Sequence, residues 1–122
     1  MTMTIKAHHF VSRDAAQAHY LAMIDAVAAR ARYVDPAQEA VYQIKLQESR
    51  SGGGPLLTAE AESIGAEVSD VALAVLRERD RWEQYAKEVE IARIKARQAV
   101  RESVNAAEMH RAVKELELSV LT

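Results

Sequence analysis

The chain has 122 residues, of which 49% are hydrophobic but only 5% aromatic, and its formal net charge is −2. This hydrophobic share argues against wholesale disorder, and the slightly negative charge argues against a dedicated nucleic-acid binder, whose surface is strongly basic. The sequence contains no cysteine, which excludes disulfides and thiolate metal sites. One domain with a thin core is expected, because alanine supplies much of the hydrophobic share and buries little area.

No apolar run approaches the roughly 20 residues that a helix needs to span a bilayer. Met1 to Lys6 lack the hydrophobic stretch of a signal peptide. We therefore expect no membrane contact.

Residues 1–11 differ in composition from the rest of the chain and are predicted to form an extended arm, with one short strand. A lone strand cannot satisfy its own backbone groups, so the arm must lie on the helices, pair with another chain or remain in water. Ile5 and Phe10 are the candidate contact residues of this arm.

Residues 12–122 are predicted to form one all-α domain. Ser12, Asp35 and Asn105 are good helix N-caps, and Gly52–Gly54 is the clearest break. The predicted helices cover residues 13–33, 36–50, 55–64, 70–104 and 106–120, with Ser69 capping the fourth. The first two are expected to form an antiparallel hairpin, the second through an apolar face of Ala37, Val41 and Ile44.

The helix over 70–104 contains no proline or glycine and would be about 50 Å long. That length exceeds the diameter of a compact domain of this size, roughly 27 to 35 Å. Its apolar residues alternate in steps of three and four, as in a coiled coil, with Glu78 interrupting: Val71, Val75, Trp82, Tyr85, Val89, Ala92, Ala96 and Ala99. This seam packs either on the chain's own helices or on another subunit, and the thin core favours the second.

A basic ladder follows on the same helix, where Arg93, Arg97 and Arg101 lie four residues apart. The ladder has three interpretations: a solvated face, a contact with an acidic partner, or binding to a phosphate backbone. The solvated face is favoured over the acidic partner, and nucleic acid is the least favoured because no aromatic stacking residues accompany the arginines.

Candidate catalytic and metal-binding groups are sparse. His8 and His9 are adjacent, so in an extended arm their side chains point in opposite directions. His19 and His110 have no acidic or histidine partner at helical ligand spacing. We expect no enzyme activity, no cofactor and no metal.

Two stretches carry a resemblance to a known group of proteins. They are RYVDPAQEAVYQIK at residues 32–45 and PLLTAEAESIG at residues 55–65, followed by Trp82 within the long helix. Together they resemble small alanine-rich proteins encoded in the tail modules of bacteriophages and prophages. The resemblance covers roughly residues 30–115, and the arm lies outside it.

The resemblance implies a non-catalytic component of the virion tail, associated with the tail or its fibres and assembled in the bacterial cytoplasm. Its expected partners are other tail proteins and further copies of itself. Such a protein would act by helix packing and by the arm adding a strand to a neighbour's sheet. The candidate interface residues are Ile5, Phe10, Val89, Ala92, Arg93, Ala96, Arg97, Ala99 and Arg101.

Two alternatives remain open. The first is a tail-fibre assembly chaperone that is absent from the mature particle. The second is a small regulatory or host-takeover protein that binds nucleic acid or a host protein.

Overall fold

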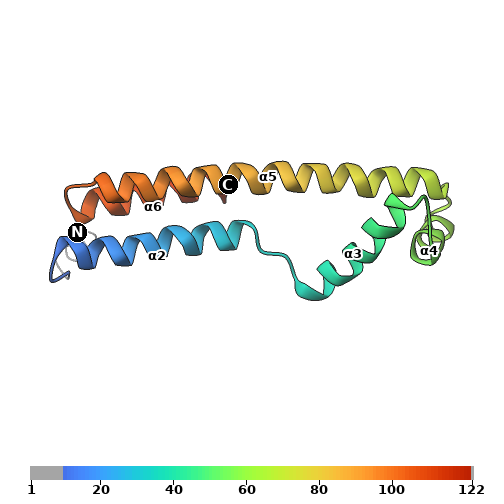
Figure 1. The fold of residues 1–122 in the computed structure, drawn as a ribbon, viewed down its shortest axis with the longest axis horizontal. Helices are drawn as coiled ribbons and strands as arrows, with labels where there is room; N and C mark the ends of the chain where they lie inside the picture. Colours follow the sequence, from blue (N-terminus) through green and yellow to red (C-terminus); the bar gives the residue numbers. More distant parts are fainter. Residues whose placement is uncertain (1–9, 122) are drawn as a thin grey trace. The chain divides into compact units, whose positions relative to one another are not determined.

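The computed structural model describes residues 10–121, which form five α-helices and no strand (Figure 1). The helices are α2 (Arg13–Ala31), α3 (Pro36–Arg50), α4 (Pro55–Ile64), α5 (Val68–Glu102) and α6 (Ala106–Val120). The predicted all-α fold with a long helix and a C-terminal helix is confirmed. None of these five helices combines the length and the apolar character required to traverse a bilayer.

Three helices begin at the caps that the sequence indicates, namely Ser12, Asp35 and Asn105. In each case the side-chain oxygen accepts a hydrogen bond from the backbone N–H three residues later, at 2.9 to 3.0 Å. These bonds satisfy amide groups that the first turn of a helix leaves without partners.

The predicted cap at Ser69 is wrong, because α5 already begins at Val68. Gly65 ends α4 in the left-handed conformation, with φ of 69°. The carbonyl of Glu67 then accepts hydrogen bonds from the amides of Asp70 and Val71, both at 3.1 Å. The carbonyl of Glu67 therefore forms the first hydrogen bonds of α5, and the hydroxyl of Ser69 is not needed as a cap.

The helices divide into two compact units. Unit 1 contains α2, α6 and the part of α5 from Ala86 onwards, and unit 2 contains α3, α4 and the part of α5 up to Tyr85. Within unit 1 α2 packs on α6, and within unit 2 α3 packs on α4.

Unit 1 has a core to which all three of its helices contribute. Figure 1 shows α2 lying alongside α6 and the C-terminal part of α5. The buried residues of this core are Ala16, Tyr20, Ile24 and Val27 of α2, Ala96 and Val100 of α5, and Met109, Ala112, Val113 and Leu116 of α6. The apolar stripe of α2 is thus buried against α6 and the C-terminal part of α5.

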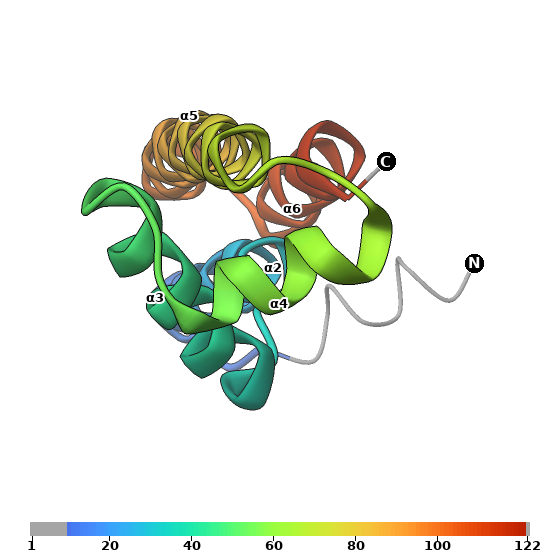
Figure 2. The ribbon, with the colours of Figure 1, turned by 90° about the vertical axis from the view of Figure 1, so that its right-hand side faces the viewer.

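Unit 2 has its own, smaller core. Figure 2 shows α4 connected by short loops to α3 on one side and to α5 on the other. The buried residues are Leu46 of α3, Leu57 and Ala61 of α4, and Val71, Ala72 and Val75 of α5. On α3 the expected apolar face is wrong: Val41 and Ile44 are about half exposed, at 47% and 51%, while Leu46 is buried.

The glycine-rich loop allows a side chain from α3 to cap α4. The two carboxylate oxygens of Glu48 accept hydrogen bonds from the amides of Leu56 at 3.2 Å and Leu57 at 2.9 Å. A Cβ atom at Gly54 would overlap the Glu48 side chain. Glycine at this position therefore makes room for the carboxylate, which stabilises the N-terminus of α4 through hydrogen bonds and the helix dipole.

Candidate functional site

The C-terminal part of α5 presents three faces within unit 1. Val89 and Ala96 are buried, at 1% and 9% exposure, and therefore belong to the interior. Arg93 lies on the side that meets α2, where its side chain is paired with Asp25. Ala92 and Ala99 lie on the side that faces α6.

The predicted alanine seam consequently splits in two. Val100, at 0% exposure, occupies the core position that the coiled-coil spacing assigned to Ala99, while Ala99 is exposed. A straight helix has 3.6 residues per turn, so a stripe drawn with a period of 3.5 drifts by about 20° per heptad. Between Val75 and Ala99 this drift shifts the buried position by one residue, from Ala99 to Val100.

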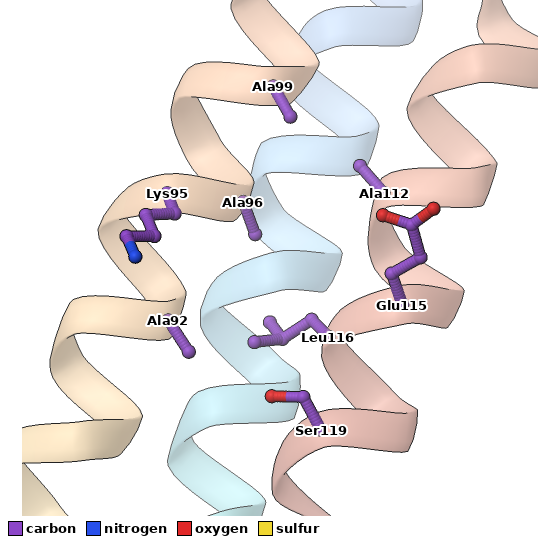
Figure 3. Close-up of a pocket in the computed structure, with 8 residues that line it drawn as sticks. All are labelled: Ala92, Lys95, Ala96, Ala99, Ala112, Glu115, Leu116 and Ser119. Atoms are coloured by element: carbon purple, nitrogen blue, oxygen red, sulfur yellow. The ribbon is translucent and has the colours of Figure 1, made fainter.

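A groove of about 240 Å³ opens between α5 and α6 (Figure 3). It is lined by Ala92, Lys95, Ala96 and Ala99 of α5 and by Ala112, Glu115, Leu116 and Ser119 of α6. Figure 3 shows the two sets facing each other across the opening, with α2 passing behind. Because most of these side chains are small, the backbone of a third helix could approach closely.

The two charged residues of the groove stand on opposite walls. Lys95 projects from α5 and Glu115 from α6, and both are exposed. Exposed apolar side chains lie nearby on the same helices, with Ile91 at 45% and Leu118 at 67% exposure. The groove thus combines an apolar floor with one positive and one negative wall.

Two of the three arginines of the basic ladder are paired within unit 1. The guanidinium of Arg93 donates to Asp25 at 2.9 Å, and that of Arg97 donates to the other oxygen of Asp25 at 2.7 Å. Arg93 also forms two hydrogen bonds with Glu90, at 3.0 and 2.8 Å. The acidic partner of these two arginines is therefore the chain itself. The backbone carbonyl of Arg101 accepts a hydrogen bond from Arg13 at 2.6 Å.

Glu90 is the most strongly perturbed carboxylate of this network. Its pKa is lowered from 4.5 to about 2, first by the hydrogen bonds from Arg93 and then by the hydrogen bond from Arg32 at 2.9 Å. The same contacts, from Glu90 and then from Asp25, raise the pKa of Arg93. Glu90 and Arg93 are therefore charged throughout the physiological pH range, and the ion pairs of Arg93 and Arg97 with Asp25 keep α2 attached to α5.

Phe10, predicted as a contact residue of the arm, packs on its own unit. Its ring centroid lies 5.1 Å from that of His19 and 5.5 Å from that of Tyr20. His110 is 6.0 Å from Tyr20, edge to face, and its Nε2 atom is buried without a hydrogen-bond partner in the described part of the chain. Burial raises the pKa of Tyr20. These rings close one end of the core of unit 1.

Ile5, the other predicted contact residue of the arm, lies outside the described residues, as do His8, His9 and the predicted strand. Within residues 10–121, no group of three or more histidine, aspartate or glutamate side chains is arranged to hold a metal ion.

Sequence reasoning missed Asp25, Arg32 and Glu90, which organise the arginine ladder. Asp25 and Arg93 are 68 residues apart, so no local pattern could connect them. The available signal was the four-residue spacing of the arginines, which requires an acidic complement when the helix face is half buried.

Comparisons of this chain with protein-family models, with curated proteins and with solved structures found no match.

Proposed function

We propose that the protein is a non-catalytic structural component of a bacteriophage tail, associated with the tail or its fibres, which binds neighbouring subunits by helix packing. The phage assignment is supported by the resemblance of residues 32–45 and 55–65 to tail-module proteins. The mode of action is supported by the groove between α5 and α6.

The groove carries the proposal because its chemistry suits a second copy of the chain. In a two-fold symmetric pair, each contact occurs twice with the roles exchanged. Lys95 of one copy can then face Glu115 of the other, and an exposed ridge such as Leu118 can enter the apolar floor. Ala92 and Ala99 offer no large side chain that would block this approach.

Nucleic-acid binding is less well supported as a function. Two of the three ladder arginines are already neutralised by Asp25 and Glu90, so the ladder offers little net positive charge. A phosphate backbone would have to displace these pairs before it could bind. Phe10 packs on its own unit and Ile5 lies outside the described residues, so the strand addition by the arm stays a prediction.

Ala99→Glu tests the groove directly. Ala99 is exposed and lines the groove, so the variant adds a charge there without entering the core. We expect the wild-type chain to self-associate in sedimentation equilibrium, and the variant to associate at least about tenfold more weakly, the factor that corresponds to burying one unpaired polar group.

Ala107→Glu is the matched control, because Ala107 is exposed in the first turn of α6 and does not line the groove. It makes the same substitution and should leave association unchanged, while circular dichroism should show the same helix content for both variants. A wild-type chain that remains monomeric, or equal effects of the two variants, would contradict the assignment of the groove.

Mass spectrometry of purified phage particles tests the location. The proposal requires the chain in intact virions at a fixed ratio to known tail proteins. Presence in the lysate with absence from purified particles would instead favour the assembly chaperone. A strongly salt-dependent shift in DNA mobility would favour the regulatory alternative.

A further inference from the structure

Unit 2 contains a pocket that the proposed function does not use. It has a volume of about 230 Å³ and lies between the start of α3 and α5. Its lining is formed by Val34, Gln38, Glu39 and Tyr42 on one side and by Glu78 and Trp82 of α5 on the other. Two aromatic rings and two carboxylates therefore meet in one small space.

Both aromatic rings of the pocket contact residues that do not line the pocket. The Tyr42 hydroxyl donates a hydrogen bond to the carbonyl of Val75 at 3.1 Å, so this group is already used within unit 2. Burial raises the pKa of Tyr42, and its phenol stays neutral. The ring of Tyr85 lies 5.8 Å from the indole of Trp82. A ligand would therefore meet rings that need little rearrangement before binding.

The pocket carries an excess of negative charge. The half-buried carboxylate of Glu39 accepts a hydrogen bond from the neutral amide of Gln43 at 2.5 Å. Glu78 pairs with Arg81 at 2.6 Å, and Arg79 pairs with Glu83 at 3.1 Å. These three carboxylates and two guanidiniums leave one negative charge in excess, and that charge lies on Glu39, inside the pocket lining.

We propose that this pocket binds the side chain of an arginine presented by a partner protein. A guanidinium stacks on an indole face through cation–π attraction, and its planar fork of donors matches carboxylate oxygens. Trp82 supplies the ring and Glu39 supplies the carboxylate whose charge is in excess, while Glu78 on the opposite side of the pocket is paired with Arg81. Lysine fits less well, because its ammonium is a compact, strongly hydrated point charge without a flat face.

Trp82 provides a direct measurement, because it is the only tryptophan in the chain. The probe is a blocked glycyl-arginyl-glycine tripeptide, titrated against the full-length protein while tryptophan fluorescence is recorded. We expect a saturable change with dissociation in the millimolar range. The same peptide with citrulline, a neutral analogue of arginine, should bind at least about tenfold more weakly, since it lacks the charge. The lysine peptide should fall between the two.

Glu39→Gln and its control separate the pocket from general charge. Removing the charge of Glu39 should weaken binding of the arginine peptide about fivefold, as expected for one partly exposed ion pair. Glu62→Gln removes the same charge from an exposed position on α4, outside the pocket lining, and should leave binding unchanged. Circular dichroism establishes that both variants keep their helix content.

The proposal is overturned by any of four results: no saturable fluorescence change, equal binding of the citrulline peptide, equal binding of the lysine peptide, or equal effects of Glu39→Gln and Glu62→Gln. The test needs neither phage particles nor self-association, so its failure leaves the proposed tail function untouched. Conversely, a chain absent from virions could still bind arginine in this pocket.

Discussion

The two units differ in how completely the charged groups beside α5 are matched by opposite charges. In unit 1 the basic side chains of α5 are matched by carboxylates: Arg93 and Arg97 share Asp25, and Arg93 also pairs with Glu90. In unit 2 the carboxylate of Glu39 faces α5 across a pocket and accepts a hydrogen bond from the neutral side-chain amide of Gln43. The first arrangement holds helices together, whereas the second leaves a negative charge for a ligand.

The two units also differ in the size of the apolar side chains that line their groove and their pocket. Unit 1 opens a groove in which four of the eight lining residues are alanines, which suits the backbone of another helix. Unit 2 opens a pocket lined by an indole and a phenol ring, which suits a single side chain. The small residues of the groove and the aromatic residues of the pocket thus suit the two different contacts proposed above.

The largest expected effects come from breaking either core. Ile24 of unit 1 and Leu57 of unit 2 are both 0% exposed. Replacing either with alanine should lower the free energy of unfolding by about 3 kcal/mol, because the cavity loses packing and apolar burial. Chemical denaturation measures the loss in the free energy of unfolding, and hydrogen exchange shows which helices are destabilised.

The division into units predicts where that exchange changes. Ile24→Ala should accelerate amide exchange in α2 and α6 more than in α3 and α4, and Leu57→Ala should do the reverse. Each variant serves as the control for the other. Equal acceleration in both units would mean that they unfold as one cooperative body.

Local features of this fold could be predicted from the sequence because they depend on near neighbours. Ser12, Asp35 and Asn105 each bond an amide three residues away, and Gly65 ends a helix through its own backbone conformation. For this reason the bounds of α3, α4 and α6 agree with the predicted ranges.

Features that depend on distant residues could not be predicted. The pairing of α2 with α6 buries Ile24 in the same core as Val113, which lies far along the chain. The pocket in unit 2 joins Glu39 to Trp82 only after α3 has packed beside α5. The placement of Val100 in the core depends on the straightness of α5, which sequence spacing alone does not fix.

A smaller effect is expected when the paired charges of unit 1 are unbalanced. Asp25→Asn removes the carboxylate charge shared by Arg93 and Arg97, whose side chains are only 26% and 22% exposed. The free energy of unfolding should fall by about 1 kcal/mol, since Asp25 itself is 47% exposed and partly screened by water.

Chemical denaturation at low and high ionic strength checks this prediction. The loss should shrink as salt rises, because salt screens partly exposed charges. Glu88→Gln is the matched control on α5, where the side chain is exposed, and it should change stability little. A loss that is the same at both ionic strengths would indicate that packing, rather than charge, is affected.

The smallest and most specific effect concerns the pH dependence of unit 1. The pKa of Glu90 is about 2 in the folded chain and has an ordinary value of 4.5, so the unfolded chain binds the proton more readily. The stabilisation from Glu90 is therefore fully present above 4.5 and is lost as the pH falls toward 2. Glu90→Gln should lower stability at about pH 5 and have a smaller effect at about pH 3.

Denaturation of the wild type and of the variant at these two pH values measures the difference. Glu88→Gln again provides the control, since Glu88 lies two residues away and is exposed. Its effect should be small at both pH values. If Glu90→Gln lowered stability equally at both, the hydrogen bonds from Arg93 and Arg32 would not be what distinguishes Glu90, and the charge matching attributed to unit 1 would lose its main support.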